Sequence, residues 1–148
     1  MIISWSAPFN GGSPLTSYTV LIRNADAINY SAELTSCDGS NPTILNSATC
    51  NIPVATLQQP PFNLPWGSSI YAKVTATNLV NPSTESNVGN GAIILTSPDA
   101  PLSVDNVPAI TDATRIGLSW IIGAANGGTP VLDYRVNWDQ GTGTYVVI

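Results

Sequence analysis

Two cysteines, Cys37 and Cys50, are the residues of this sequence with the clearest chemistry. They flank a short polar segment, and the chain contains no histidine, so a zinc ion would lack ligands beyond the two thiolates. A disulfide that closes a loop of this size would stabilise the fold by roughly 3 kcal/mol in the chain-entropy model. It would also favour an oxidising, extracellular location. A pair of free, buried cysteines is the alternative.

Other catalytic groups are missing from the sequence. Serine and cysteine nucleophiles need an adjacent base, which histidine commonly supplies, and acid–base pairs need carboxylates with separated pKa values. We therefore expect no enzymatic activity and no cofactor. Four aspartates could offer oxygen ligands to calcium, but their spacing matches no calcium loop and solubilising charge explains them better. They are Asp105, Asp112, Asp133 and Asp139.

Asn29 begins the one Asn-x-Ser/Thr sequon whose middle residue is not proline, Asn29-Tyr30-Ser31. If the chain is secreted, Asn29 is a candidate site for an N-linked glycan. The alternative is a chance sequon, since the chain is rich in asparagine and serine. Glycans are therefore an expected partner only in the secreted case.

Three aromatic residues are candidates for contact with a partner. Trp66 and Phe62 lie among prolines before a predicted strand, where they could form an exposed patch for a sugar or another chain, although such residues more often cap a sandwich. Trp138 follows Val136 on the strand predicted over residues 134–139. If Val136 faces the core, we expect Trp138 to lie on the other face, exposed to a neighbouring module or chain.

Composition favours a β-protein. Hydrophobic residues make up 43% and charged residues only 9% of the chain, against about 25% charged in typical proteins. Ser, Thr, Asn and Gly must then cover the surface, which suits strands better than helices. With 4 basic against 9 acidic residues, no basic stripe can neutralise a phosphate backbone, so we exclude nucleic acid as a partner. No apolar run approaches the ~20 residues that span a bilayer, so we expect no membrane insertion.

One local pattern occurs twice: a strand ending in tryptophan, an Asn-Gly-Gly-x-Pro turn and a strand opening with tyrosine. The two copies are Ile3-Ser4-Trp5 with residues 10–14 and Tyr18, and Leu118-Ser119-Trp120 with residues 126–130 and Tyr134. Glycine permits positive φ and proline prevents a continuing helix, so these are turns. A nucleotide-binding loop would require a helix after the glycines. We interpret the chain as two successive copies of one module.

The segments between the copies supply further strands. Residues 71–77 alternate, with Tyr71 and Lys73 on one face and Ala72 and Val74 on the apolar face. Taken in order, four features resemble the fibronectin type III family: Trp5, the segment Leu64-Gly67-Tyr71, residues 76–78 and the Pro-Asp-Ala-Pro linker at 98–101. The resemblance implies an all-β fold of tandem immunoglobulin-like sandwiches, with Trp5 and Trp120 in the cores. It also makes Tyr71 a core tyrosine at the corner before strand F, hydrogen-bonded to upstream backbone.

The resemblance divides the chain after residue 97. Residues 1–97 would form a module that lacks strand A and carries an insertion from Cys37 to Cys50, with strands B, C, E, F and G near 2–6, 18–23, 48–53, 70–77 and 92–96. Residues 98–148 would form the N-terminal half of a second module, with strands A, B, C and C' near 102–107, 115–121, 134–139 and 144–148. The turns and the cysteine loop look more like large repeat proteins of protists or microbes than like animal adhesion modules.

We expect a structural function in an extracellular or cell-surface filament of repeated sandwiches. An unfinished sandwich leaves strand edges unpaired, so either the chain belongs to a longer array or neighbouring copies donate strands and form a homopolymer. The longer array is favoured, because a copy that begins at strand B does not supply strands E, F and G to the module before it. The alternatives are an adhesion or receptor ectodomain fragment that binds a protein or glycan through its loops, and an accessory module of a secreted carbohydrate-active enzyme.

Overall fold

The computed structural model describes the backbone of residues 1–148 and every side chain except that of Asn90. The chain forms two compact units, Met1–Leu95 and Thr96–Ile148. Most of its regular structure is β-strand paired in antiparallel sheets, so the expected all-β class is confirmed. Within the described part of the chain, no helix is long and apolar enough to cross a bilayer.

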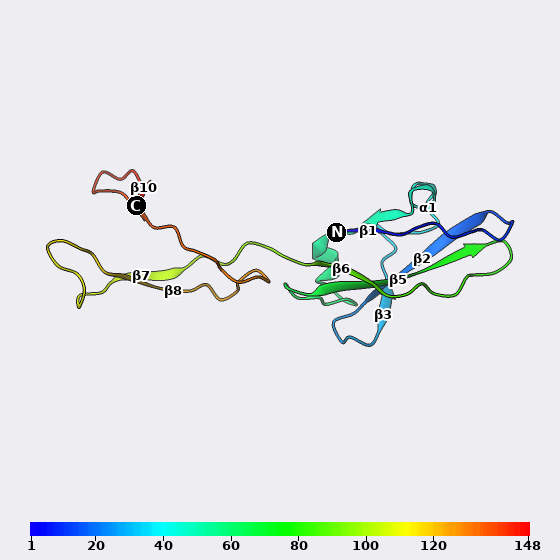
Figure 1. Ribbon diagram of the computed structural model, residues 1–148, viewed down its shortest axis with the longest axis horizontal. Coiled ribbons are helices and arrows are strands. Elements are labelled where there is room, and N and C mark those ends of the chain that lie inside the picture. Colours follow the sequence, from blue (N-terminus) through cyan, green and yellow to red (C-terminus); the bar gives the residue numbers. More distant parts are fainter. The chain divides into compact units, whose positions relative to one another are not determined.

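A four-stranded antiparallel sheet forms one layer of the first unit, in the order β3-β2-β5-β6 (Figure 1). Its strands are β2 (Leu15–Arg23), β3 (Tyr30–Ala32), β5 (Ser69–Asn78) and β6 (Gly89–Ile93). Val20 and Ile22 of β2 are buried and lie opposite Val74 and Ala72 of β5. Because successive side chains on a strand point to opposite faces, these pairs make one face of the sheet apolar.

The second layer of the first unit consists of two antiparallel strands, β1 (Ile2–Ser4) and β4 (Thr49–Asn51). Cys50 of β4 belongs to the same buried cluster as Ile22, and Ile3 packs against that cluster from β1. Trp5, just beyond β1, meets the ring of Tyr18 edge-on, with 5.1 Å between ring centroids. The two layers therefore enclose one core.

The segment between the two cysteines contains a helix, α1 (Pro42–Ser47), where we expected only a polar loop. The Asn41 side chain caps it by accepting a hydrogen bond from the Thr43 N–H at 2.9 Å, and proline occupies the first helical position. Both are preferred helix-start residues. Cys37 and Cys50 form a disulfide, with 5.1 Å between their Cα atoms, which ties this segment to the core.

A second short helix, α2 (Val54–Leu57), and the chain after it close one end of the sandwich. Three apolar side chains of this stretch are buried in the core, and they are Leu57, Phe62 and Leu64. Neither helix nor the edge strand β3 was predicted from the sequence. β6 begins at Gly89, three residues before the predicted start, and the other strands of this unit lie within a few residues of their predicted positions.

The second unit contains two separate strand pairs, β7 with β8 and β9 with β10. Their bounds are β7 (Leu102–Asn106), β8 (Leu118–Ile121), β9 (Asn137–Trp138) and β10 (Val146–Val147). Of the strand expected over residues 134–139, only Asn137 and Trp138 are in a strand. The rings of Trp120 and Tyr134 are in contact at 5.2 Å between centroids with a tilt of 56°, a pair that corresponds to Trp5 and Tyr18 in the first unit. No apolar side chain among the described residues of this unit is fully buried, so the unit has no core of its own.

Candidate functional site

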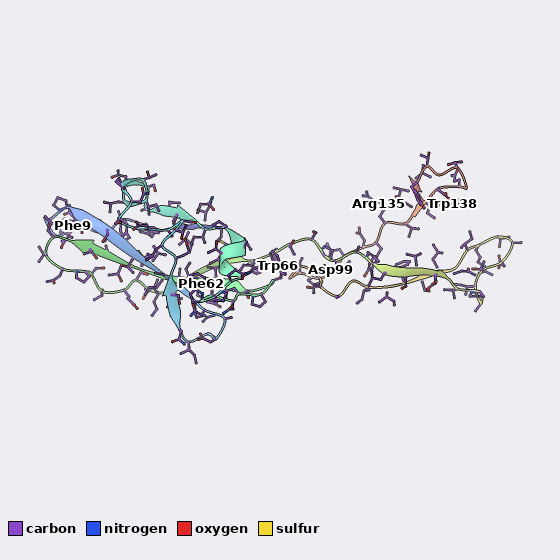
Figure 2. The ribbon with its side chains drawn as sticks, turned by 180° about the vertical axis from the view of Figure 1, so that it is seen from behind. Phe9, Phe62, Trp66, Asp99, Arg135 and Trp138 are labelled. Carbon is purple, nitrogen blue, oxygen red and sulfur yellow. A yellow bond between two sulfur atoms is a disulfide. The ribbon has the colours of Figure 1, made fainter. Side chains whose placement is uncertain are left out.

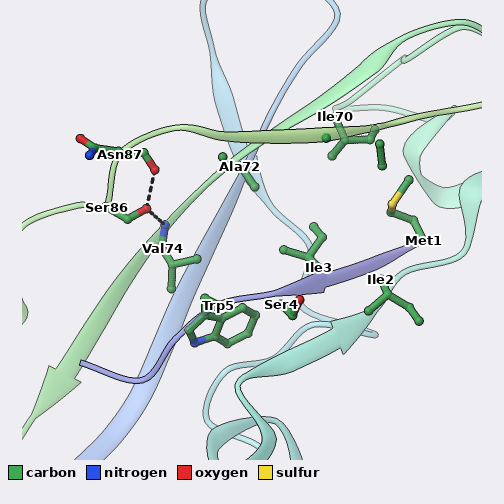
Figure 3. Close-up of a pocket in the computed structure, with 13 residues that line it drawn as sticks. Met1, Ile2, Ile3, Ser4, Trp5, Ile70, Ala72, Val74, Ser86 and Asn87 are labelled. Atoms are coloured by element: carbon green, nitrogen blue, oxygen red, sulfur yellow. Dashed lines mark hydrogen bonds between the residues drawn. The ribbon is translucent and has the colours of Figure 1, made fainter. Parts of the chain in front are cut away.

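A groove of about 420 Å³ lies between β1 and the sheet of β5 and β6 (Figure 3). Ile3 and Trp5 line it on the β1 side, with Ala72 and Val74 facing them from β5. All four also pack against the core cluster, so the groove opens onto the interior of the sandwich. Its remaining lining residues are Met1, Ile2, Ser4, Ile70, Ser86, Asn87, Gly89, Gly91 and Ala92. An additional strand beside such a groove could bury its apolar side chains there.

One edge of β1 is unpaired in the described sheets, because β1 pairs with β4 alone. On the β4 side, the Ile52 N–H donates to the Met1 carbonyl at 2.7 Å and the Trp5 N–H donates to the Ala48 carbonyl at 3.0 Å. In an antiparallel ladder, alternate residues direct their N–H and C=O groups to opposite sides. The backbone groups of Ile2 and Ser4 therefore point away from β4, as donors and acceptors for another strand.

The wall of the groove opposite β1 is irregular. The Ser86 N–H donates to the Val74 carbonyl at 2.9 Å, and the Val74 N–H donates to the Ser86 hydroxyl at 3.0 Å. Ser83 repeats this arrangement with Ala76, at 2.7 and 3.1 Å. The two serine hydroxyls thus accept hydrogen bonds from N–H groups of β5 that a regular neighbouring strand would otherwise accept. A Cβ placed on Gly91 would meet no atom within 4 Å, so the groove is open at that point.

Of the two aromatic residues before β5, only Trp66 is exposed. Its exposed fraction is 41%, whereas that of Phe62 is 2% (Figure 2). The prediction that Phe62 contributes to an interface was therefore wrong. Its N–H donates to the Gln59 carbonyl at 3.0 Å and its carbonyl accepts from Ala25 at 2.8 Å, and this turn places the ring in the core.

Tyr71 does not lie in the core, and its assignment as a core tyrosine was wrong. Even-numbered residues of β5, such as Ile70 and Ala76, are buried, so Tyr71 lies on the outer face of the sheet. The Arg23 guanidinium covers its ring, with the carbon at 3.6 Å from the centroid. Sequence alternation alone placed Tyr71 on the polar face, and the family resemblance suggested otherwise.

The same outer face carries a second cation over an aromatic ring. Lys73 Nζ lies 4.6 Å from the Tyr30 ring centroid and 2.9 Å from a carboxylate oxygen of Glu85. The hydrogen bond that Lys73 donates to the Glu85 carboxylate raises the pKa of Lys73 above its usual value. Two cation–π contacts, Arg23 with Tyr71 and Lys73 with Tyr30, therefore stabilise the outer face of this sheet.

Trp5 and Trp120 each contact a tyrosine, but they differ in whether a buried core packs against them. Both are partly buried and each contacts the tyrosine that opens the following strand. Trp5 also packs against the buried core of the first unit. Trp120 lines a cavity of about 140 Å³ with Val104 and Leu118 in a unit without a core. We expected both indoles to lie in sandwich cores. Trp5 packs against such a core, whereas Trp120 does not.

Trp138 is 48% exposed (Figure 2). The reason given from the sequence was wrong, because Val136 and Trp138 are two residues apart and such residues share one face of a strand. Exposure arises instead because β9 pairs only with β10 and no layer covers either strand. As a candidate interface residue, Trp138 is one member of a larger exposed apolar surface.

Asn29 is exposed at the turn that joins β2 to β3. Its Nδ2 donates to Asp26 Oδ2 at 2.6 Å, and the Asp26 carboxylate also accepts the N–H groups of Ile28 and Asn29. These backbone hydrogen bonds, with that of Ile28 first, lower the pKa of Asp26. A glycan would replace one of the two hydrogens on Nδ2, and the other could still donate to Asp26. The geometry therefore does not decide glycosylation, which stays a prediction.

The turn between β7 and β8 is organised by one carboxylate. Asp112 Oδ1 accepts from the Thr114 hydroxyl at 2.7 Å and from the Thr114 N–H at 2.8 Å, and Oδ2 accepts from Arg115 Nε at 2.9 Å. These hydrogen bonds favour the anion and lower the pKa of Asp112 from 3.8 to about 2. The turn is thus held by an ionised side chain.

We expect this turn to loosen in acid. Because the folded pKa of Asp112 is depressed, its contribution is complete above 3.8 and is lost as the pH falls through about 2. Amide chemical shifts of Thr114 and Arg115, followed by NMR, should therefore titrate with a midpoint near 2. The Asp112→Asn variant should show no such titration, and a midpoint at the ordinary aspartate value would contradict this assignment.

No protein-family model matches the chain. Among the described side chains, no three carboxylates or cysteines gather into a cluster that could hold a metal ion. Three features of the described residues are unpaired or uncovered, and they are the free edge of β1, its apolar groove and the strands of the second unit. All are surfaces suited to binding another polypeptide.

Proposed function

We propose that the chain is a structural, non-enzymatic part of an extracellular or cell-surface filament built from fibronectin type III-like sandwiches. Strand order supports the module type. The sheet β3-β2-β5-β6 corresponds to strands C', C, F and G, and the pair β1-β4 corresponds to B and E. This is the order expected of the family with strand A missing. No single sequence motif predicts this strand order.

The observation that carries the proposal is the apolar surface of the second unit. Large apolar side chains of this unit are exposed in every strand, and those of its strands include Leu102, Val104, Leu118, Ile121, Trp138, Val146 and Val147. Exposed apolar surface on this scale marks a protein–protein contact. Because the exposed residues lie on strands with free edges, pairing with further strands is the contact that would cover them.

The disulfide supports an extracellular location. Cys37 and Cys50 are 2% and 3% exposed, so the bond is shielded inside the first unit. Disulfides of this kind form and persist in oxidising compartments. In the proposed filament, the bond would hold each module together while neighbouring modules supply the inter-module contacts.

Assembly of the secreted, oxidised chain tests the proposal. We expect size-exclusion chromatography with light scattering to show masses above 15.4 kDa that rise with concentration, and negative-stain micrographs to show particles with a regular repeat. A chain that stays monomeric at all concentrations, or forms only amorphous aggregates, would contradict the proposal. A monomer that binds glycans on an array would instead favour the adhesion alternative.

A further inference from the structure

We propose that the free edge of β1 is a strand-acceptor site, and that its occupant is β7 of a second copy of this chain. The proposal rests on self-assembly as the proposed function and names the contact that would produce it. Three observations lead to it: the backbone groups left free on β1, the strand that pairs with the equivalent residues in the second unit, and the shape of the groove.

The repeat identifies the partner of β1. Ile3-Ser4-Trp5 of the first unit corresponds to Leu118-Ser119-Trp120 of the second, which spans β8. β8 pairs antiparallel with β7, and in this register Ser119 lies opposite Asp105. β1 therefore has a local sequence similar to that of a strand that binds β7, but its corresponding edge is unoccupied in the described sheets.

The free backbone groups also correspond. In the second unit, Ser119 pairs with β7 and the Gly117 carbonyl accepts from the Val107 N–H at 2.9 Å. Their equivalents in the first unit are Ser4 and Ile2, whose backbone groups point away from β4. A β7 strand docked on β1 in the register of β8 would thus meet donors and acceptors at the right alternate positions.

The side chains of β7 suit the groove. Val104 already lines a cavity with Leu118 and Trp120 in the second unit. In the equivalent position on β1, Val104 would contact Ile3 and Trp5, which line the larger groove. There it would be covered by β5 as well, whereas every residue of β7 is exposed in the strand pair with β8.

Transfer of β7 from β8 of its own copy to β1 of a second copy is favourable because it buries apolar side chains. An isolated two-stranded ribbon is marginally stable in water. On β1, β7 would replace its ladder with β8 by an equivalent ladder, and the net gain would be burial of its apolar side chains against the packed sandwich. A strand of one copy on a different surface of the next copy is a heterologous contact, and its repetition produces an open chain of subunits wherever the rotation between copies does not close a ring. One pairing would therefore generate a filament.

Disulfide trapping tests this contact. One tagged copy carries Ser4→Cys and a differently tagged copy carries Asp105→Cys, so that only a bond between copies can join the two tags. Opposed residues in an antiparallel pair have Cβ atoms about 4.5–5.5 Å apart, which permits a bond after mild oxidation. We expect a cross-linked dimer on a non-reducing gel, with the Ser4→Cys to Asp105→Cys bond confirmed by peptide mass.

Two controls make the test specific. Ala113→Cys places an exposed thiol in the β7–β8 turn without removing one of its hydrogen bonds, and we expect it to cross-link to Ser4→Cys at least about tenfold less. Gly91→Val in the acceptor copy should reduce the Asp105→Cys product by a similar factor, because the added side chain occupies open space in the groove. Gly91 lacks a positive φ, so the variant should fold.

The outcomes separate this inference from the proposed function. Equal yields with Asp105→Cys and Ala113→Cys, in a chain that still forms regular assemblies, would overturn the β7 contact and leave the filament standing. A double variant, Ser4→Cys with Asp105→Cys, that closes only within one copy would overturn donation to a second copy. A monomer in the scattering experiment would contradict the filament itself.

Discussion

Replacing both Cys37 and Cys50 by alanine is expected to lower the free energy of unfolding of the first unit by about 3 kcal/mol or more. The bond closes a loop with a sequence separation of 13, and its loss lets the unfolded chain expand. Both sulfurs are buried in the core cluster, so their removal also leaves a space that the surrounding side chains cannot fill completely. A single domain has only about 5–15 kcal/mol of stability, so this loss is a large part of the total.

Urea denaturation followed by circular dichroism measures the effect. The oxidised protein and the Cys37→Ala/Cys50→Ala variant are compared with and without a reducing agent. We expect the reducing agent to destabilise the native sequence and to leave the variant unchanged. A difference below about 1 kcal/mol between the oxidised native protein and the variant would show that the bond contributes little to the fold.

The second large effect is a contrast between two isoleucines on strands. Ile22 on β2 is fully buried, whereas Ile121 on β8 is 60% exposed. Ile22→Ala should destabilise the first unit by about 2–5 kcal/mol, because it removes buried apolar area and leaves a cavity. Ile121→Ala should change the stability of the monomeric chain by less than about 0.5 kcal/mol. The two substitutions remove the same atoms, so the difference reports burial alone.

Self-assembly is expected to make the otherwise silent Ile121→Ala substitution costly, through association and not through the stability of the monomer. If strands of another copy cover the second unit, Ile121→Ala should weaken association while leaving the unfolding of the first unit unchanged. Denaturation at low concentration and light scattering at high concentration measure the two effects separately. Equal destabilisation by Ile22→Ala and Ile121→Ala in dilute solution would mean that the second unit already has a core.

Local patterns predicted the elements that depend on local chemistry. Alternation over residues 71–77 predicted β5 and its buried face. The first Asn-Gly-Gly-x-Pro turn, residues 10–14, lies directly before β2, whereas the second, residues 126–130, is followed by a strand only at Asn137. α1 also had a local signal, Asn41-Pro42, which is a helix cap followed by a first-turn proline, but the polar composition of the segment concealed it. β3 is a three-residue edge strand with no apolar pattern, and nothing in its sequence distinguishes it from a turn.

Tertiary packing decided the remaining features. Phe62 lies among prolines typical of an exposed loop, yet the turn from Gln59 places its ring in the core. The groove beside β1 combines residues near the start of the chain with residues of β5 and β6, so no local window contains it. Free strand edges are likewise a property of the sheets, since they depend on which strands find partners.

Hydrogen exchange, resolved by residue and recorded at two protein concentrations, tests the central claim most directly. The paired amides of β2 and β5 should be protected at both concentrations, because they lie in the packed sheet. In dilute solution, the Ser4 amide and the amides of β7 should exchange rapidly, and at high concentration both should become protected together. Strong protection of β7 and β8 in the dilute monomer, or a Ser4 amide that exchanges at the same rate at both concentrations, would contradict the account.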